Sequence, residues 1–118
     1  MSTPQRIFDI VDFIQPSPDT PIRSVMRETP DSVVVVWHAR PGQEIAPHLH
    51  PAGQDTWIVI SGSAQYYQGN GVRRPLVKGQ VAVARPGEVH GALNEGSEDF
   101  VFVSVVSSGA AGYEPTVP

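Results

Sequence analysis

Three of the four histidines in the chain stand at spacings that suit a metal ion. His48 and His50 are two residues apart, Asp55 follows five positions later, and His90 lies forty positions beyond His50. In a β-strand, residues two apart project from the same face, so the paired imidazoles face one point. Three imidazoles and a carboxylate suit one divalent transition metal: iron, manganese, nickel, cobalt, zinc or copper. These four residues are therefore the predicted ligands.

The stretch around the histidine pair, residues 42–62, reads GQEIAPHLHPAGQDTWIVISG and resembles the first motif of the cupin family. That motif is a glycine, five residues, His-x-His, a short spacer, an acidic residue, six residues and a second glycine. The residues in its slots are Gly42, His48, His50, Asp55 and Gly62, with aspartate in place of the usual glutamate.

A second block resembles the other cupin motif, which ends in a histidine, three intervening residues and an asparagine. The residues in its slots are Gly79, Gly87, His90 and Asn94, while Arg85 takes the usual proline position and Pro86 is displaced by one. The resemblance to small single-domain cupins implies an RmlC-like jelly roll with one metal between its sheets. It also implies a homodimer.

The identity of the fourth ligand depends on the motif spacer. Counting back from Gly62 over six intervening residues selects Asp55, whereas a three-residue spacer after His50 selects Gln54. A carboxylate also lowers the charge of a divalent site, and an uncompensated buried charge is costly. Aspartate is, however, about 1.5 Å shorter than glutamate, roughly one carbon–carbon bond. Asp55 is therefore the predicted ligand and Gln54 the alternative.

The elements that position these residues are predicted to be strands. Short apolar runs end at glycine or proline at nearly every junction, and Gly69-Asn70-Gly71 reads as a tight hairpin turn. The predicted strands are 22–28, 32–40, 56–60, 63–68, 72–77, 80–84, 90–93 and 100–106. Residues 6–14 are predicted to form a short strand and a helical turn, residues 43–49 to be mostly irregular, and residues 107–118 to be a loop. This pattern predicts an all-β fold, a small antiparallel β-barrel or jelly roll.

Five further residues are candidates for the lining of a pocket beside the metal. Trp57 lies on the predicted face of Asp55, and one of the adjacent Tyr66 and Tyr67 points inward as a candidate proton donor. His38 is better explained as a core or edge histidine with a hydrogen-bond partner, the alternative being a place in the pocket. Arg40 shares its face, and if buried would favour an anionic ligand such as a carboxylate. That inference does not apply if Arg40 faces solvent.

The length, charge and cysteine content of the chain argue against several classes of protein. The 118 residues, 40% of them hydrophobic, predict one domain spanning 1–118 with short irregular tails at both ends. A net charge of −4 without a basic run argues against nucleic-acid binding, and no apolar stretch is long enough to span a membrane. The absence of cysteine leaves only nitrogen and oxygen ligands. With no signal-peptide pattern at the N-terminus, a cytoplasmic location is expected.

Three functions are compatible with these observations. The first is a mononuclear metal enzyme of the dioxygenase or isomerase type that acts on a small organic molecule. The alternative is a small-molecule-binding or sensing module without turnover. The third is a barrel whose metal is structural or adventitious. Fold resemblance alone does not choose among them.

Overall fold

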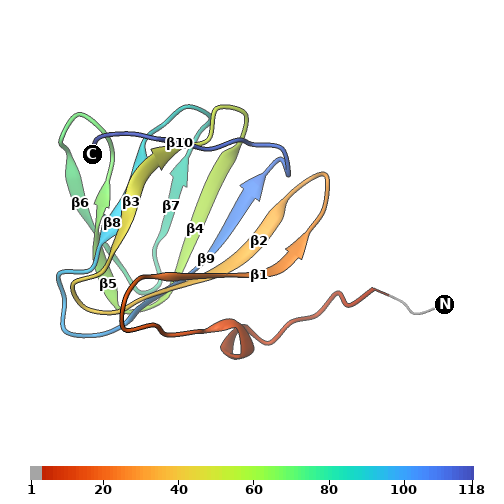
Figure 1. Cartoon of the computed structure of the whole chain (residues 1–118), viewed down its shortest axis with the longest axis horizontal. Coiled ribbons are helices and arrows are strands. Elements are labelled where there is room, and N and C mark those ends of the chain that lie inside the picture. Colours follow the sequence, from red (N-terminus) through yellow and green to blue (C-terminus); the bar gives the residue numbers. More distant parts are fainter. Residues whose placement is uncertain (1–3) are drawn as a thin grey trace.

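The computed structural model describes residues 4–118 and contains two antiparallel five-stranded sheets that face each other (Figure 1). The elements are a 3-10 helix η1 (Ile10–Phe13) and the strands β1 (Ile22–Glu28), β2 (Val33–Ala39), β3 (Glu44–Leu49), β4 (Gln54–Ser61), β5 (Ser63–Tyr67), β6 (Arg73–Val77), β7 (Val81–Ala84), β8 (His90–Leu93), β9 (Phe100–Ser107) and β10 (Glu114–Pro115). The first sheet has the order β1-β2-β9-β4-β7 and the second β10-β3-β8-β5-β6. They are called the β9 sheet and the β8 sheet below. The prediction of a small all-β jelly roll is confirmed.

The β9 sheet is buried on both faces at β2 and β9, which explains the run of valines in β2. Phe100 and Phe102 of β9 point between the sheets, while Val101 and Val103 point outward. The outward side chains are covered by the N-terminal segment, including Ile10 and residues 13–14. A strand enclosed on both faces needs apolar residues at successive positions instead of alternate ones.

An aromatic core fills the space between the sheets and lies next to the predicted metal ligands. Trp57 stacks on Phe102 with ring centroids 4.0 Å apart, and Tyr66 meets Trp57 edge to face at 5.3 Å. Trp57 also meets the ring of His90 edge to face at 5.9 Å. Since Asp55 is two residues before Trp57 on β4, it projects from the same inner face of the β9 sheet.

Most of segment 43–49, which was predicted to be mostly irregular, forms the strand β3 (Glu44–Leu49), which pairs with β8. The pairing shifts register between Ile45 and His48, which places Pro47 inside a bulge. Proline lacks the N–H that a regular ladder needs, so a bulge is one of the few places in a sheet that accepts it. The proline is the reason why the sequence pattern did not predict this strand.

The two ends of the chain also differ from their predictions. Residues 7–8 lie outside any strand, and only the helical turn η1 forms in segment 6–14. The C-terminal segment predicted to be a loop contributes β10, whose Glu114 and Pro115 pair with Leu49 and His48 of β3. The tail therefore adds an edge strand to the β8 sheet beside the predicted ligands. Residues 1–3 of the expected N-terminal tail lie outside the described residues.

Within residues 4–118, no helix combines the length and the apolar character required to cross a membrane.

Candidate metal centre

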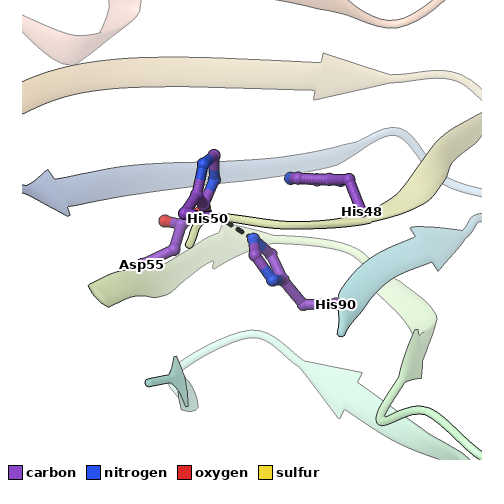
Figure 2. A group of neighbouring side chains, drawn as sticks. All are labelled: His48, His50, Asp55 and His90. Atoms are coloured by element: carbon purple, nitrogen blue, oxygen red, sulfur yellow. Dashed lines mark hydrogen bonds and ion pairs between the residues drawn. The ribbon is translucent and has the colours of Figure 1, made fainter. Parts of the chain in front are cut away.

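The four predicted ligands meet between the two sheets. His48 lies on β3 opposite His90 of β8, His50 follows the end of β3, and Asp55 comes from β4 of the facing sheet. Each offers one ligand atom, and all four atoms lie within 4.8 Å of one another. Figure 2 shows the four side chains directed toward a common space from these separate strands. The fold therefore brings together residues that are up to 42 positions apart.

Each imidazole is oriented through its other ring nitrogen. All three Nδ1 atoms lie against a backbone carbonyl, which can only accept, so each Nδ1 carries the hydrogen and donates it. The acceptors are the carbonyl of Ala46 for His48 at 2.7 Å, that of Gly112 for His50 at 2.6 Å and that of Glu88 for His90 at 3.1 Å. This leaves every Nε2 lone pair available for a metal. Such carbonyl partners of the second nitrogen are typical of metal-binding histidines.

Asp55 completes the group from the opposite sheet. Its Oδ1 accepts a hydrogen bond from the hydroxyl of Ser104 at 2.5 Å. Its Oδ2 lies 3.0 Å from Nε2 of His90 and 3.3 Å from Nε2 of His50. Because those nitrogens present lone pairs when their Nδ1 atoms are protonated, they would repel the carboxylate unless a cation lies between them. The cation is either an added proton or a metal ion.

The spacing of these atoms fits a metal ion. Two ligand atoms about 2.1 Å from one ion and at right angles to each other stand about 3.0 Å apart, close to both Asp55 distances. Gln54, the alternative ligand, is exposed on β4, where successive side chains point to opposite faces. The aspartate is long enough to reach the cluster despite being shorter than glutamate.

The protonation states favour metal binding at two of the ligands. Burial raises the pKa of Asp55, but hydrogen bonds from His50, His90 and Ser104 outweigh it and hold that pKa well below its usual range. Burial, reinforced by the neighbouring His90, lowers the pKa of His48 to about 4. The hydrogen bond to Asp55 raises the pKa of His50, although burial opposes the shift. A metal must therefore displace a firmly held proton from His50, whereas His48 is already neutral at neutral pH.

An open cavity of about 570 Å³ leads to the cluster. His48, His50 and Asp55 lie in its wall beside the Ser104 that holds the carboxylate. Further lining residues come from β1, β2 and the C-terminal tail: Arg23, Trp37 and Tyr113. The ring of Tyr113 stacks on His48 with centroids 5.0 Å apart. Arg23 stands near enough for its positive charge to work against the raised pKa of His50.

The aromatic candidates for the cavity lining lie elsewhere. Trp57 and Tyr66 belong to the aromatic core behind the cluster, where Trp57 supports His90. Tyr67 projects from the opposite face of β5 and donates its hydroxyl hydrogen to Glu44, with Arg73 over its ring. None of these three tyrosine and tryptophan side chains is part of the cavity wall.

The two polar candidates are also outside the cavity. His38 is buried on the outer side of β2, where its Nε2 lies 2.8 Å from a carboxylate oxygen of Asp99. Arg40 is exposed beyond the end of β2, so it provides no argument for an anionic ligand. His38 lies outside the cavity because successive side chains of a strand point to opposite faces, and its neighbour Trp37 faces the cavity.

Four residues around the site were not anticipated from the sequence. Ser104 is the only polar residue inside the apolar run 100–106, a signal that could have singled it out. Arg23 and Trp37 are opposite each other in the β1–β2 ladder, but the sequence does not show which face of that ladder encloses a cavity. Tyr113 lies in a tail without strand periodicity and gave no signal.

Comparisons with known proteins agree with this architecture. The cupin domain family model matches residues 35–106. The crystal structure of an uncharacterised conserved protein with a double-stranded β-helix domain from Klebsiella pneumoniae is 58% identical, with 98% of this chain and 100% of that chain covered and a TM-score of 0.94. No curated protein matches the chain significantly.

Two solved structures named as enzymes share the fold at low identity. A predicted oxalate decarboxylase from Thermotoga maritima is 19% identical with a TM-score of 0.68, and 80% of this chain and 97% of that chain are covered. An oxalate oxidase in complex with the substrate analogue glycolate is 16% identical with a TM-score of 0.75, and 93% of this chain and 63% of that chain are covered. At these identities the likeness shows the fold alone. Because the family model matches more than half of the residues of this chain, the chain belongs to the cupin domain family.

Proposed function

We propose that this protein is a mononuclear metal enzyme of the dioxygenase or isomerase type that acts on a small organic molecule. The observation that supports the proposal is the convergence of three oriented imidazole Nε2 atoms and the Asp55 carboxylate at the wall of an open cavity. A divalent first-row metal bound there supplies Lewis-acid polarisation of a substrate oxygen and, if it is iron or copper, redox chemistry with dioxygen.

The protein residues have separate roles in this proposal. His48, His50, His90 and Asp55 hold the ion. Ser104 keeps the Asp55 carboxylate in one orientation through its 2.5 Å hydrogen bond. The three backbone carbonyls fix the imidazole tautomers, so the lone pairs are arranged before the metal arrives.

The cavity favours a reaction or ligand site over a structural ion. A structural metal is closed off by protein ligands on all sides, whereas a catalytic ion keeps an accessible position. Here three of the four candidate ligands line a space of about 570 Å³, a size suited to a small organic molecule. The aromatic core around Trp57 and Phe102 lies beside the site and packs without the ion.

Similar enzymes give additional support of a general kind. The oxalate oxidase and the predicted oxalate decarboxylase have names that denote enzymes and share this fold. They indicate that the fold accommodates catalysis on small molecules. The fold alone does not determine a reaction, so the reaction of this chain depends on the residues that line its own cavity.

The test begins with elemental analysis of protein purified without a histidine tag. Oxygen uptake is then followed after adding iron(II) and a panel of phenolic, thiol and keto-acid compounds, and isomerisation of the same compounds is followed without oxygen. His90→Gln should lose metal and activity, whereas His38→Gln, outside the cluster, should keep both. Stoichiometric metal and ligand binding without turnover of any compound would support the non-catalytic binding module instead.

A homodimer and a cytoplasmic location, both expected from the sequence, stay predictions. Exposed apolar side chains are grouped on the outer face of the β9 sheet, where Ile58 is opposite Val81 in the β4–β7 ladder and Val83 is close by. Sedimentation velocity of the untagged protein measures the oligomeric state directly.

A further inference from the structure

We propose that Arg23 binds the carboxylate of a small organic acid inside the cavity that the metal centre shares. The inference rests on the proposed function for the role of the metal, and it adds the class of substrate. It assigns Arg23 as the residue that positions the acid and Trp37 as the wall for its apolar part.

The placement of Arg23 follows from the register of β1 and β2. Arg23 is the partner of Trp37 in this antiparallel ladder, so both side chains project from the same face. Both line the cavity together with His48 and His50. An arginine and a candidate metal ligand thus face the same open cavity from opposite sheets.

Arg23 has its hydrogen-bonding capacity free in the structure. Within residues 4–118 it makes no ion pair and donates no side-chain hydrogen bond. Arg73 and Arg85, in contrast, are paired with Glu95 and Glu88. A guanidinium presents a planar fork of donors that matches a carboxylate in a two-point contact.

None of the three acidic residues of the cavity wall forms an ion pair with Arg23. The oxygens of Asp55 face Ser104, His50 and His90, and the carboxylate of Glu44 accepts a hydrogen bond from the Tyr67 hydroxyl. Glu28 is opposite Val33, four positions along β2 from Trp37, which is about 13 Å at the usual rise of a strand. The part of the cavity between Arg23 and the histidines is therefore electrically positive when a divalent metal is bound.

Apolar side chains make up much of the remaining wall and determine the other half of the ligand. Trp37 contributes an aromatic face, and Val33, Val106 and Pro21 line the same space. A cavity of about 570 Å³ with one free arginine, one candidate metal centre and a largely apolar wall fits a single-ring or short-chain carboxylic acid. A dicarboxylate or a phosphate ester would leave that apolar surface unused.

The test compares benzoate with its neutral isostere benzamide by isothermal titration calorimetry. Wild type, Arg23→Lys, Arg23→Gln and Arg27→Gln are titrated in metal-free and zinc-loaded form. Arg27 lies on the same strand, outside the cavity wall, and is the matched control. Since a hydrogen bond to a charged group contributes about 1.5–3 kcal/mol, Arg23→Gln should weaken benzoate binding about ten- to hundredfold. Arg23→Lys should restore part of the affinity.

Benzamide binding should be the same in wild type and Arg23→Gln, and Arg27→Gln should bind both probes normally. Equal binding of benzoate and benzamide to wild type, equal benzoate binding to wild type and Arg23→Gln, or no benzoate binding at millimolar concentration would overturn the proposal. Failure of the metal site is seen separately, as absence of zinc binding, because the metal-free titration still measures the Arg23 contribution. Circular dichroism melting of Arg23→Gln should match wild type, since that side chain is exposed.

Discussion

The imidazole of His50 donates its Nδ1 hydrogen to the backbone carbonyl of Gly112 across 2.6 Å, although the two residues are 62 positions apart. The C-terminal tail therefore belongs to the candidate metal centre. Its strand β10 pairs with β3 at His48, and the Tyr113 ring stacks on the His48 imidazole. The tail orients one candidate ligand and packs against another.

Deleting residues 112–118 should weaken metal binding about ten- to hundredfold, the usual effect of losing the partner that orients a metal-bound histidine. The deletion removes the Gly112 carbonyl and frees His50 to rotate. Zinc titration of the untagged metal-free protein measures the effect. Tyr113→Ala is the control, because it keeps the carbonyl and removes only the ring, and it should change the affinity much less. Equal losses in both variants would assign the effect to the ring instead.

The parts of the fold that the sequence predicts are those with an unbroken local signal. The valine run of β2 and the phenylalanine–valine run of β9 indicate strands because burial on both faces demands apolar residues throughout. β3 and β10 were not predicted, since Pro47 interrupts one and the other is a two-residue edge strand next to glycine and proline. Their pairing depends on contacts between distant segments that local patterns do not encode.

The candidate site also has a part that the sequence predicts, the metal ligands, and a part that it does not, the cavity wall. The two-residue spacing of His48 and His50 predicts one shared face, and the structure brings both rings together, with centroids 5.1 Å apart. The cavity wall was not predicted: Arg40 was the proposed arginine, and Arg23 is the one that faces the space. Strand alternation separates two faces, but which face is enclosed depends on how the sheets and the N-terminal segment pack.

The fourth ligand can be tested by a pair of neighbouring substitutions. Asp55→Ala should weaken zinc binding severely, because it removes a buried carboxylate that lies 3.0 Å from His90. Gln54→Ala should leave the affinity unchanged, because that side chain is exposed on the other face of β4. Loss of zinc from the Gln54 variant together with retention by the Asp55 variant would identify a three-histidine, one-glutamine centre.

Ser104→Ala should lower zinc affinity by about tenfold, since the serine hydroxyl is the hydrogen-bond donor that orients Oδ1 of Asp55. The substitution removes one buried hydroxyl and leaves the strand apolar, so the fold should be retained. Ser107→Ala on the same strand is exposed and serves as the matched control. An affinity equal to wild type in the Ser104 variant would show that Asp55 is held by its histidine neighbours alone.

Removing the metal should leave the fold in place. The stacked rings of Trp57 and Phe102, 4.0 Å apart, belong to a buried core of ten residues drawn from both sheets, and none of its contacts requires an ion. We expect chelated protein to keep its β-type circular dichroism and to melt cooperatively at a lower temperature, because bound metal stabilises only the folded state. Complete unfolding by a chelator at room temperature would contradict this expectation.

Metal affinity should decrease as the pH is lowered, and the decrease should begin at a pH above 6.5, the ordinary pKa of histidine. A histidine must lose its Nε2 proton to bind a metal, and the hydrogen bond to Asp55 raises the pKa of His50 above that value. His48 does not compete in this range, because burial lowers its pKa to about 4 and it stays neutral. Below the pKa of His50, each further decrease of one pH unit should therefore reduce the apparent affinity by at least about tenfold, because at least one proton is released for each metal bound.

Competition titrations with a zinc chelator from neutral pH downward measure this dependence. The Asp55→Asn variant separates the His50 proton from other effects of pH. Without the carboxylate the pKa of His50 should drop, since Asp55 is the main cause of its increase. The variant should bind zinc more weakly at every pH, yet its affinity should begin to fall only at a lower pH than in wild type. A midpoint that does not move would mean that the His50–Asp55 contact does not hold the competing proton.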